Sequence, residues 1–255
     1  MRKITTKPVL LVLLALLVLL GATAEKKPEN TAIAFPVKGE YSKLIVSSAF
    51  NVSFSDSVKD ARVTIPQNFQ KQVVVEVDKG VLRIALRSKA RLKKTPTVVL
   101  PSNSRLNNIE LSGAATLTAG HLERDEMAIY LTGAARFRGD ITAKQVSIEQ
   151  AGASDYRGKL FVDNVSLNLS GASKAEIRGR ALIKMNLKMI EACSLDAEKL
   201  EARRIEGSLD GASSAILWCT ERMTVPVSNA SHLTYIGRPL VVNCPASDVS
   251  TVNRK

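Results

Sequence analysis

The stretch Leu111-Ser112-Gly113-Ala114-Ala115 decides the fold, because close copies of it recur down the chain. Five copies keep the glycine and two replace it, so this position is occupied by Gly113, Gly133, Gly152, Gly171, Glu191, Gly211 and Asn229. Successive copies are 18 to 20 residues apart. A period this regular predicts a repeat architecture.

Apolar side chains recur at fixed distances from the glycine position. Two residues before it, six copies carry Leu111, Leu131, Leu169, Met189, Leu209 and Val227. Four residues after it come Leu117, Phe137, Tyr156, Ala175, Leu195, Ala215 and Leu233. Polar residues lie between these positions, so each repeat alternates between inward and outward side chains as a strand does.

The residue after the glycine position is alanine in every copy: Ala114, Ala134, Ala153, Ala172, Ala192, Ala212 and Ala230. We expect these alanines to stack at a tight inward corner where a larger side chain would not fit. The glycines are expected to adopt a left-handed or bulged conformation at this bend. Asn229 tolerates that conformation, whereas Glu191 does so poorly, so the coil around Glu191 should be distorted.

About 20 residues per repeat with strand periodicity and no helical pattern predict an all-β fold, a β-helix-like solenoid in which each coil bonds to the next. The repeats span residues 105–243, and a β portion at 41–104 continues or caps them. A hairpin is expected with its turn at Asp78-Lys79-Gly80. A leucine-rich repeat would need a Leu-x-x-Leu-x-Leu-x-x-Asn spacing that is absent. A β-sandwich with regular hairpins remains the competing fold.

The chain has 255 residues, 45% hydrophobic and 4% aromatic, with a formal net charge of +12. This length and composition exclude disorder for most of it, and so few aromatic residues argue against nucleic-acid binding by base stacking. Residues 1–24 read as a signal peptide, with a basic start, an apolar run from Val9 to Leu20 and small residues up to Ala24. That run is too short for a membrane span. Residues 25–40 then read as a linker and 244–255 as a tail.

Three cysteines are too few for a disulfide scaffold, even in an exported protein. One bridge at most can form. The first expectation is Cys219 with Cys244, because Cys193 falls within a repeat position.

The repeats resemble the exported bacterial family called the putative auto-transporter adhesin, head GIN domain. The resemblance covers about residues 41–243 and includes the strands Phe50-Asn51-Val52 and Leu82-Arg83-Ile84 and the segment Tyr235-Ile236-Gly237-Arg238-Pro239. It implies a right-handed β-helix-like fold and an envelope or secreted location. It brings no catalytic residues to transfer.

An enzyme on a β-helix would need clustered carboxylates, and the repeats stack one such pair, Glu176 with Asp196. Such a pair is more typical of a solvated face balanced by neighbouring cations. The two histidines, His121 and His232, have no partner at metal-ligand spacing. We therefore expect no catalytic residue, no metal and no cofactor.

The strongest charged feature is an acid-free basic segment between Lys79 and Lys94. Its candidate binding residues are Arg83, Arg87, Lys89, Arg91, Lys93 and Lys94. They could bind an acidic polysaccharide, lipopolysaccharide phosphates or a membrane surface. The alternative is an edge strand that its charges keep from pairing.

These observations favour an exported, non-enzymatic protein, periplasmic, surface-displayed or secreted. Its function would be binding or adhesion at the cell envelope or to an extracellular polymer such as a polysaccharide, through many weak contacts along a rigid rod. A carbohydrate-active enzyme on the same fold is the first alternative. A structural envelope component that associates with its own kind is the second, and an unprotected solenoid end would mark it.

Overall fold

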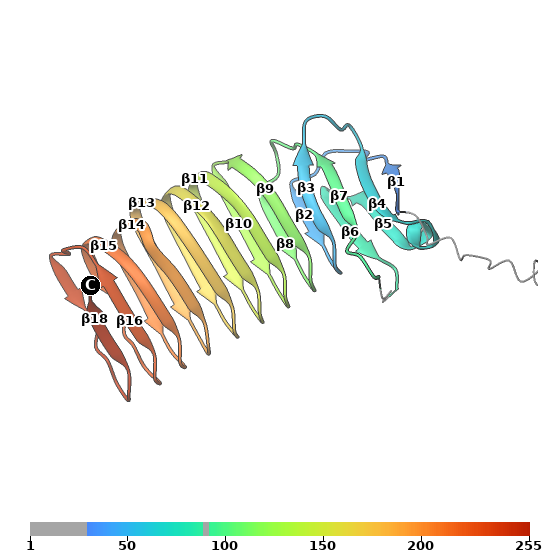
Figure 1. The fold of residues 1–255 in the computed structure, drawn as a ribbon. Helices are drawn as coiled ribbons and strands as arrows, with labels where there is room; N and C mark the ends of the chain where they lie inside the picture. Colours follow the sequence, from blue (N-terminus) through green and yellow to red (C-terminus); the bar gives the residue numbers. More distant parts are fainter. Residues whose placement is uncertain (1–29, 89–91) are drawn as a thin grey trace, which may run out of the picture.

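The computed structural model describes residues 30–88 and 92–255, so the predicted signal peptide lies outside the described residues. The chain forms a β-solenoid of about 8 turns with about 19 residues per turn. Figure 1 shows the coils stacked along one long axis, from the amino-terminal strands to the carboxyl-terminal ones. The predicted all-β solenoid is confirmed.

Eighteen strands and one short 3-10 helix make up the described chain. In chain order they are β1 (Asn30–Phe35), β2 (Lys43–Val46), β3 (Asn51–Ser55), β4 (Ala61–Pro66), η1 (Gln67–Gln72), β5 (Val73–Asp78), β6 (Val81–Leu86), β7 (Thr97–Pro101), β8 (Asn108–Leu111), β9 (Thr116–Glu123), β10 (Glu126–Leu131), β11 (Arg136–Gln150), β12 (Asp155–Leu169), β13 (Lys174–Met189), β14 (Ser194–Leu209), β15 (Ser214–Thr224), β16 (His232–Ile236), β17 (Val241–Asn243) and β18 (Thr251–Arg254).

Each long strand bends and contributes to two faces of the solenoid. The first half of β11 pairs with β9 and its second half with β10, and β12 to β14 continue both pairings in parallel. We call the surface formed by β4, β7, β3, β9 and the first halves of β11 to β15 the β9 face. The opposite surface, formed by β6, β2, β8, β10 and the second halves, is the β10 face. The hydrophobic core lies between them.

The amino-terminal β portion both continues and caps the solenoid. Strands β2 and β3 pair in parallel with β8 and β9 and so form a coil of the same stack. Strands β1, β4 and β5 instead pair antiparallel, with β4, β7 and β6 respectively. The β5–β6 hairpin turns at Lys79 and Gly80, as predicted, and both residues have positive φ angles.

The register between coils reproduces the repeat read from the sequence. Leu117 pairs with Phe137, Phe137 with Tyr156, and the row continues through Ala175, Leu195 and Ala215 to Leu233. These seven residues are buried, and so are the apolar residues two before the glycine position. The rings of Phe137 and Tyr156 stack with centroids 5.2 Å apart. Both predicted apolar rows are confirmed.

The repeated glycines occupy tight turns between the two faces. All five have φ angles between 65° and 77°, which is the left-handed region expected for them. They also stack closely, because a Cβ added at Gly171 would lie 2.8 Å from the backbone oxygen of Gly152. Two separate constraints therefore favour glycine here.

The alanine after the glycine position does not point inward, contrary to the prediction. Ala114, Ala134, Ala153, Ala172, Ala192 and Ala212 are exposed, and Ala230 is half-buried. This residue is the second of the two central turn residues, so its side chain lies on the outside of the bend. The small inward row is one residue later and consists of Ala115, Ala135, Ser154, Ser173, Cys193, Ser213 and Ser231, all buried.

The coil around Glu191 is regular toward the preceding coil and altered toward the next one. Glu191 adopts the left-handed conformation with a φ of 71°, like the glycines. Regular hydrogen bonds flank it, from the amide of Ala192 to Gly171 O at 2.9 Å and from Ser194 to Ser173 O at 3.0 Å. On the other side, Ala212 donates its amide to Asn229 O at 2.7 Å, and Glu191 O instead accepts from Ser213 Oγ at 2.8 Å. The predicted distortion is therefore found only where this coil meets the next one.

Two segments expected to be irregular contain strands. β1 lies within the predicted linker, where Ile33 and Phe35 alternate and pack against the core while the backbone pairs with β4. β18 lies within the predicted tail and pairs with β16, which extends the stack by a further coil. Short alternation without the repeat motif left both strands unrecognised in the sequence.

The expected bridge between Cys219 and Cys244 is not formed, and all three cysteines are free. The register explains this, since Cys244 follows the strand that pairs with Arg222 to Thr224 and so lies beside Val225 rather than Cys219. Cys219 is buried, with its Sγ 3.2 Å from the backbone oxygen of Arg222. Burial raises the pKa of this thiol.

Candidate functional site

The predicted basic segment lies near the amino-terminal end of the solenoid. Arg83 projects outward from β6, Arg87 follows the end of that strand, and Lys93 and Lys94 lie in the connection to β7; all four are exposed. Lys89 and Arg91 lie outside the described residues. β6 pairs with β5 on one side and β2 on the other, so it is not the edge strand that the alternative reading required.

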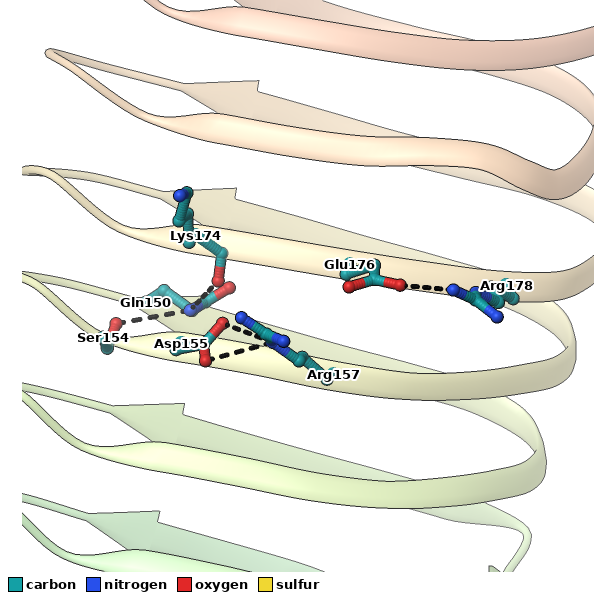
Figure 2. A network of polar contacts seen from close by, with 7 residues as sticks. All are labelled: Gln150, Ser154, Asp155, Arg157, Lys174, Glu176 and Arg178. Carbon is teal, nitrogen blue, oxygen red and sulfur yellow. Dashed lines mark hydrogen bonds and ion pairs between the residues drawn. The ribbon is translucent and has the colours of Figure 1, made fainter.

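Two carboxylates of the repeats are ion-paired with neighbouring arginines, whereas Asp196 accepts the backbone amide of Glu198 at 3.1 Å. Figure 2 shows both ion pairs. Arg157 Nε lies 3.2 Å from Asp155 Oδ2, and Arg178 Nη2 lies 2.6 Å from Glu176 Oε1. Glu176 and Asp196 occupy paired positions on adjacent coils, as predicted from the repeat. The Glu176–Arg178 pair supports the solvated-face interpretation of this carboxylate pair.

Gln150 interrupts the inward apolar row with a buried amide. Its Nε2 donates to the backbone oxygen of Lys174 at 3.0 Å and to the hydroxyl of Ser154 at 3.3 Å, while its Oε1 has no partner among the described residues (Figure 2). The amide therefore ties two coils together from inside. It does not open to the surface, because the side chain is buried.

A second polar cluster lies at the turns of the later coils. Asp210 Oδ1 accepts hydrogen bonds from Asn229 Nδ2 at 2.5 Å and from Ser228 Oγ at 3.0 Å. These bonds lower the pKa of Asp210, with that from Asn229 contributing most. The hydroxyl beside the glycine position bonds to the preceding coil in two copies: Ser228 donates to Asp210 Oδ1, and Ser170 donates to Gln150 O at 3.1 Å.

Two outward rows cross the β9 face, one strand after another. One row consists of Arg62, Val99, Ser53, Thr118, Arg138 and Arg157, and the other of Thr64, Thr97, Asn51, Thr116, Arg136 and Asp155. We define the arginine–hydroxyl face as the first five members of each row. Its ten positions carry three arginines and no acid, and all ten are exposed or half-exposed.

The arginine–hydroxyl face was not recognised from the sequence. Arg136 lies between two inward positions of its repeat, which predicts an outward side chain but no function. The available signal was the pair Arg136 and Arg138 on one strand with Arg157 one repeat later. The other half of the face could not be found this way, because β4, β7 and β3 lie outside the repeat and their order across the sheet does not follow the chain.

The β10 face is lined by small polar side chains over two shallow hollows. One hollow of about 590 Å³ contains Asn108, Gln145, Ser147, Asn164, Ser166 and Asn186, and a neighbouring one of about 380 Å³ contains Tyr130, Glu149, Asn168 and Lys188. Each hollow extends across several coils because equivalent positions are stacked. Both hollows have the volume of a small-molecule site, but each is open to solvent and would not bury a ligand.

An apolar patch projects where β12 and β13 bend between the two faces. Phe161, Leu182 and Ile183 are 50%, 52% and 49% exposed. The cause is local, since β13 has one residue more than β12 between the paired positions Val162–Ala181 and Asn164–Lys184. That extra residue pushes Leu182 and Ile183 outward from an otherwise regular bend.

Residues 30–88 and 92–255 include no group of three or more His, Cys, Asp or Glu side chains that could hold a metal ion. The same residues include no helix long and apolar enough to cross a membrane.

Solved structures of other proteins share this architecture. A putative adhesin from Parabacteroides merdae superposes with a TM-score of 0.81 at 15% identity, over 90% of this chain and 97% of that one. A putative adhesin from Parabacteroides distasonis gives 0.80 at 20% identity, over 90% and 98%. A putative lipid binding protein from the same species gives 0.80 at 17% identity, over 90% and 98%. These likenesses show the fold alone.

No curated protein matches the sequence. A family model does match, over residues 40–239, and it is the one that the repeats resemble. That span includes β2 to β16 and all seven copies of the repeat. The chain belongs to the family of the putative auto-transporter adhesin, head GIN domain.

Proposed function

We propose that this chain is an exported, non-enzymatic protein that binds or adheres at the cell envelope or to an extracellular polymer. The observation that carries this proposal is the pair of flat faces on which outward polar side chains repeat from coil to coil. Paired positions on adjacent coils are about 4.8 Å apart, so the faces offer hydrogen-bond donors and acceptors in regular rows. The family and its adhesin-named structural neighbours support an adhesion-like function.

Multivalency gives such a surface its affinity. Each exposed hydrogen bond or ion pair contributes little in water. A rigid rod holds many of them in fixed register, so an extended polymer that makes one contact meets the next at high effective concentration. The flat faces suit an extended polymer better than a small ligand.

The basic segment is the proposed entry point for an acidic ligand. Arg83, Arg87, Lys93 and Lys94 are exposed around β6, and Lys89 and Arg91 belong to the same stretch of sequence. Their charge would speed the approach of an anionic polymer and make its binding sensitive to salt. The acidic headgroups of a lipid would be attracted in the same way.

A carbohydrate-active enzyme is the less favoured function. A glycosidase places two carboxyl groups on either side of the scissile bond, one of them free to donate a proton. In the described repeats Asp155 and Glu176 are ion-paired and Asp210 is bonded to Asn229 and Ser228. Nothing in this arrangement prepares a carboxyl group as the acid.

The test is binding to bacterial and host polysaccharides at two salt concentrations, with analysis of the polymer after incubation. We expect binding that weakens at high salt and leaves the polymer intact. Cleavage would overturn the proposal in favour of an enzyme. Export is tested separately by amino-terminal sequencing of protein recovered outside the cytoplasm, which is expected to begin at Glu25.

Self-association is the second candidate, and the last coil favours it. Leu240 and Val249 there are 87% and 76% exposed, and Val242 is 43% exposed. Covering these side chains with a second copy would remove apolar surface from water. Sedimentation of the protein with and without the double substitution Leu240→Ser and Val249→Ser decides it, since only an association through this coil would be lost in the variant.

A further inference from the structure

We propose that the arginine–hydroxyl face binds an acidic polysaccharide that lies along the axis of the solenoid. This inference rests on the proposed binding function and adds the ligand class and the site. The site is separate from the basic segment around β6, because it is formed by β4, β7, β3, β9 and β11 on the β9 face.

The first observation is that the polar side chains of this face have no partners in the protein. Among the described residues, Arg62, Arg136 and Arg138 form no ion pair or side-chain hydrogen bond, whereas eleven such ion pairs occur elsewhere on the chain. The same holds for the remaining polar members of the face, Asn51, Ser53, Thr64, Thr97, Thr116 and Thr118. All nine are therefore free to bond to a ligand, and no side chain has to be released first.

The second observation is a like-charge contact that stability alone would not favour. Arg138 and Arg157 occupy directly paired positions on β11 and β12. Like charges opposite each other destabilise a sheet. Arg136 is a third arginine, two residues before Arg138 on β11, so the two Cα atoms are about 6.7 Å apart. An anionic group placed over Arg136 and Arg138 would offset the repulsion and gain bidentate hydrogen bonds.

Asp155 makes this corner of the face more selective. It lies beside Arg136 in the register and is ion-paired with Arg157. Figure 2 shows this pair, which occupies the Arg157 guanidinium. Arg136 and Arg138 form no ion pair within the described residues. The carboxylate also repels any anion that approaches from the β12 side, so the favoured path for the ligand leads from β11 toward β9 and β3.

The composition of the rest of the face suits a sugar chain. Six neutral residues with hydroxyl or amide groups cover β4, β7, β3 and β9 between Arg62 and Arg138. From β4 to β11 there are four inter-strand steps, or about 19 Å. Hydroxyl and amide groups bond to sugar hydroxyls in either direction, since they both donate and accept. Arginines at the two ends would bind carboxylate or sulfate groups.

The experiment compares two double variants that lose the same charge. R136Q/R138Q alters the face, and K38Q/R238Q removes two exposed cations in connections outside both faces, which also form no ion pair in the described residues. Affinity is measured for alginate, which carries carboxylates, for dextran sulfate, and for neutral dextran. Unchanged circular dichroism and unfolding midpoints show that both variants are folded.

We expect R136Q/R138Q to bind at least one acidic polymer about tenfold more weakly than K38Q/R238Q, and dextran to bind poorly to all forms. The comparison of alginate with dextran sulfate shows which anionic group the face prefers. Equal losses in the two variants would overturn the assigned face and leave the proposed binding function intact. Dextran bound as tightly as the acidic polymers would overturn the ligand class. Failure of the unaltered protein to bind any polysaccharide would overturn both proposals.

Discussion

Replacing Gly171 by alanine tests whether the glycine turns are fixed by stacking as well as by backbone conformation. Gly171 has a φ of 77°, which costs an L-residue about 1–2 kcal/mol. The added Cβ would also lie 2.8 Å from Gly152 O and 2.9 Å from Gly152 N. Neither atom can move without shifting its own coil, so overpacking adds about 1–3 kcal/mol. Together these effects predict a loss of about 2–5 kcal/mol.

Gly80 provides the matched control, because its φ is also 77° and nothing lies within 4 Å of a Cβ added there. Gly80→Ala should therefore cost only the conformational part, about 1–2 kcal/mol. The assay is urea unfolding of both variants, followed by circular dichroism. Equal losses at the two positions would refute the argument that the close approach of successive glycines limits this site.

Three further predictions follow from particular contacts. Tyr156→Phe should raise the free energy of unfolding by about 1 kcal/mol, because the buried Tyr156 hydroxyl has no partner among the described residues and phenylalanine keeps the ring stack with Phe137. A lower stability of the variant in thermal unfolding would show that the hydroxyl is bonded. Titration of the unfolded chain with a thiol reagent, without reductant, should find three thiols, whereas one thiol would indicate a bridge. Hydrogen bonds lower the pKa of Asp210 in the folded protein below the usual 3.8, so the Asp210 carboxylate should stabilise the fold above pH 3.8 and lose this effect as the pH falls through its pKa in the folded state. The difference in unfolding free energy between the wild type and Asp210→Asn should therefore shrink in acid. A difference that does not change with pH would contradict this.

The repeat itself could be predicted because two physical signals agreed. The spacing of the glycine position fixed the length of each coil, and alternation fixed which residues point inward. Leu117, Phe137 and Tyr156 are therefore buried where expected. Turn geometry was harder to predict, because a run of alanines indicates small size without showing whether the cause is a crowded core or an exposed bend. Ala114 is exposed for the second reason.

The candidate site was less predictable than the fold. The arginine–hydroxyl face joins β11 to strands that lie 35 to 85 residues earlier in the chain, and β4 reaches it by antiparallel pairing with β7. No periodic signal links Arg62 with Arg138, since the strands between them follow the order β4, β7, β3, β9. Similarly, the exposed Leu182 depends on one extra residue in β13, which the variable spacing of the repeats concealed.

The most direct test of the account is a crystal structure of the protein with an alginate oligosaccharide bound. The account predicts the sugar chain along the solenoid axis over β3, β9 and β11, with a carboxylate within hydrogen-bond distance of Arg136 or Arg138. An oligosaccharide seated in the hollows of the β10 face, with the arginine–hydroxyl face left uncovered, would contradict it.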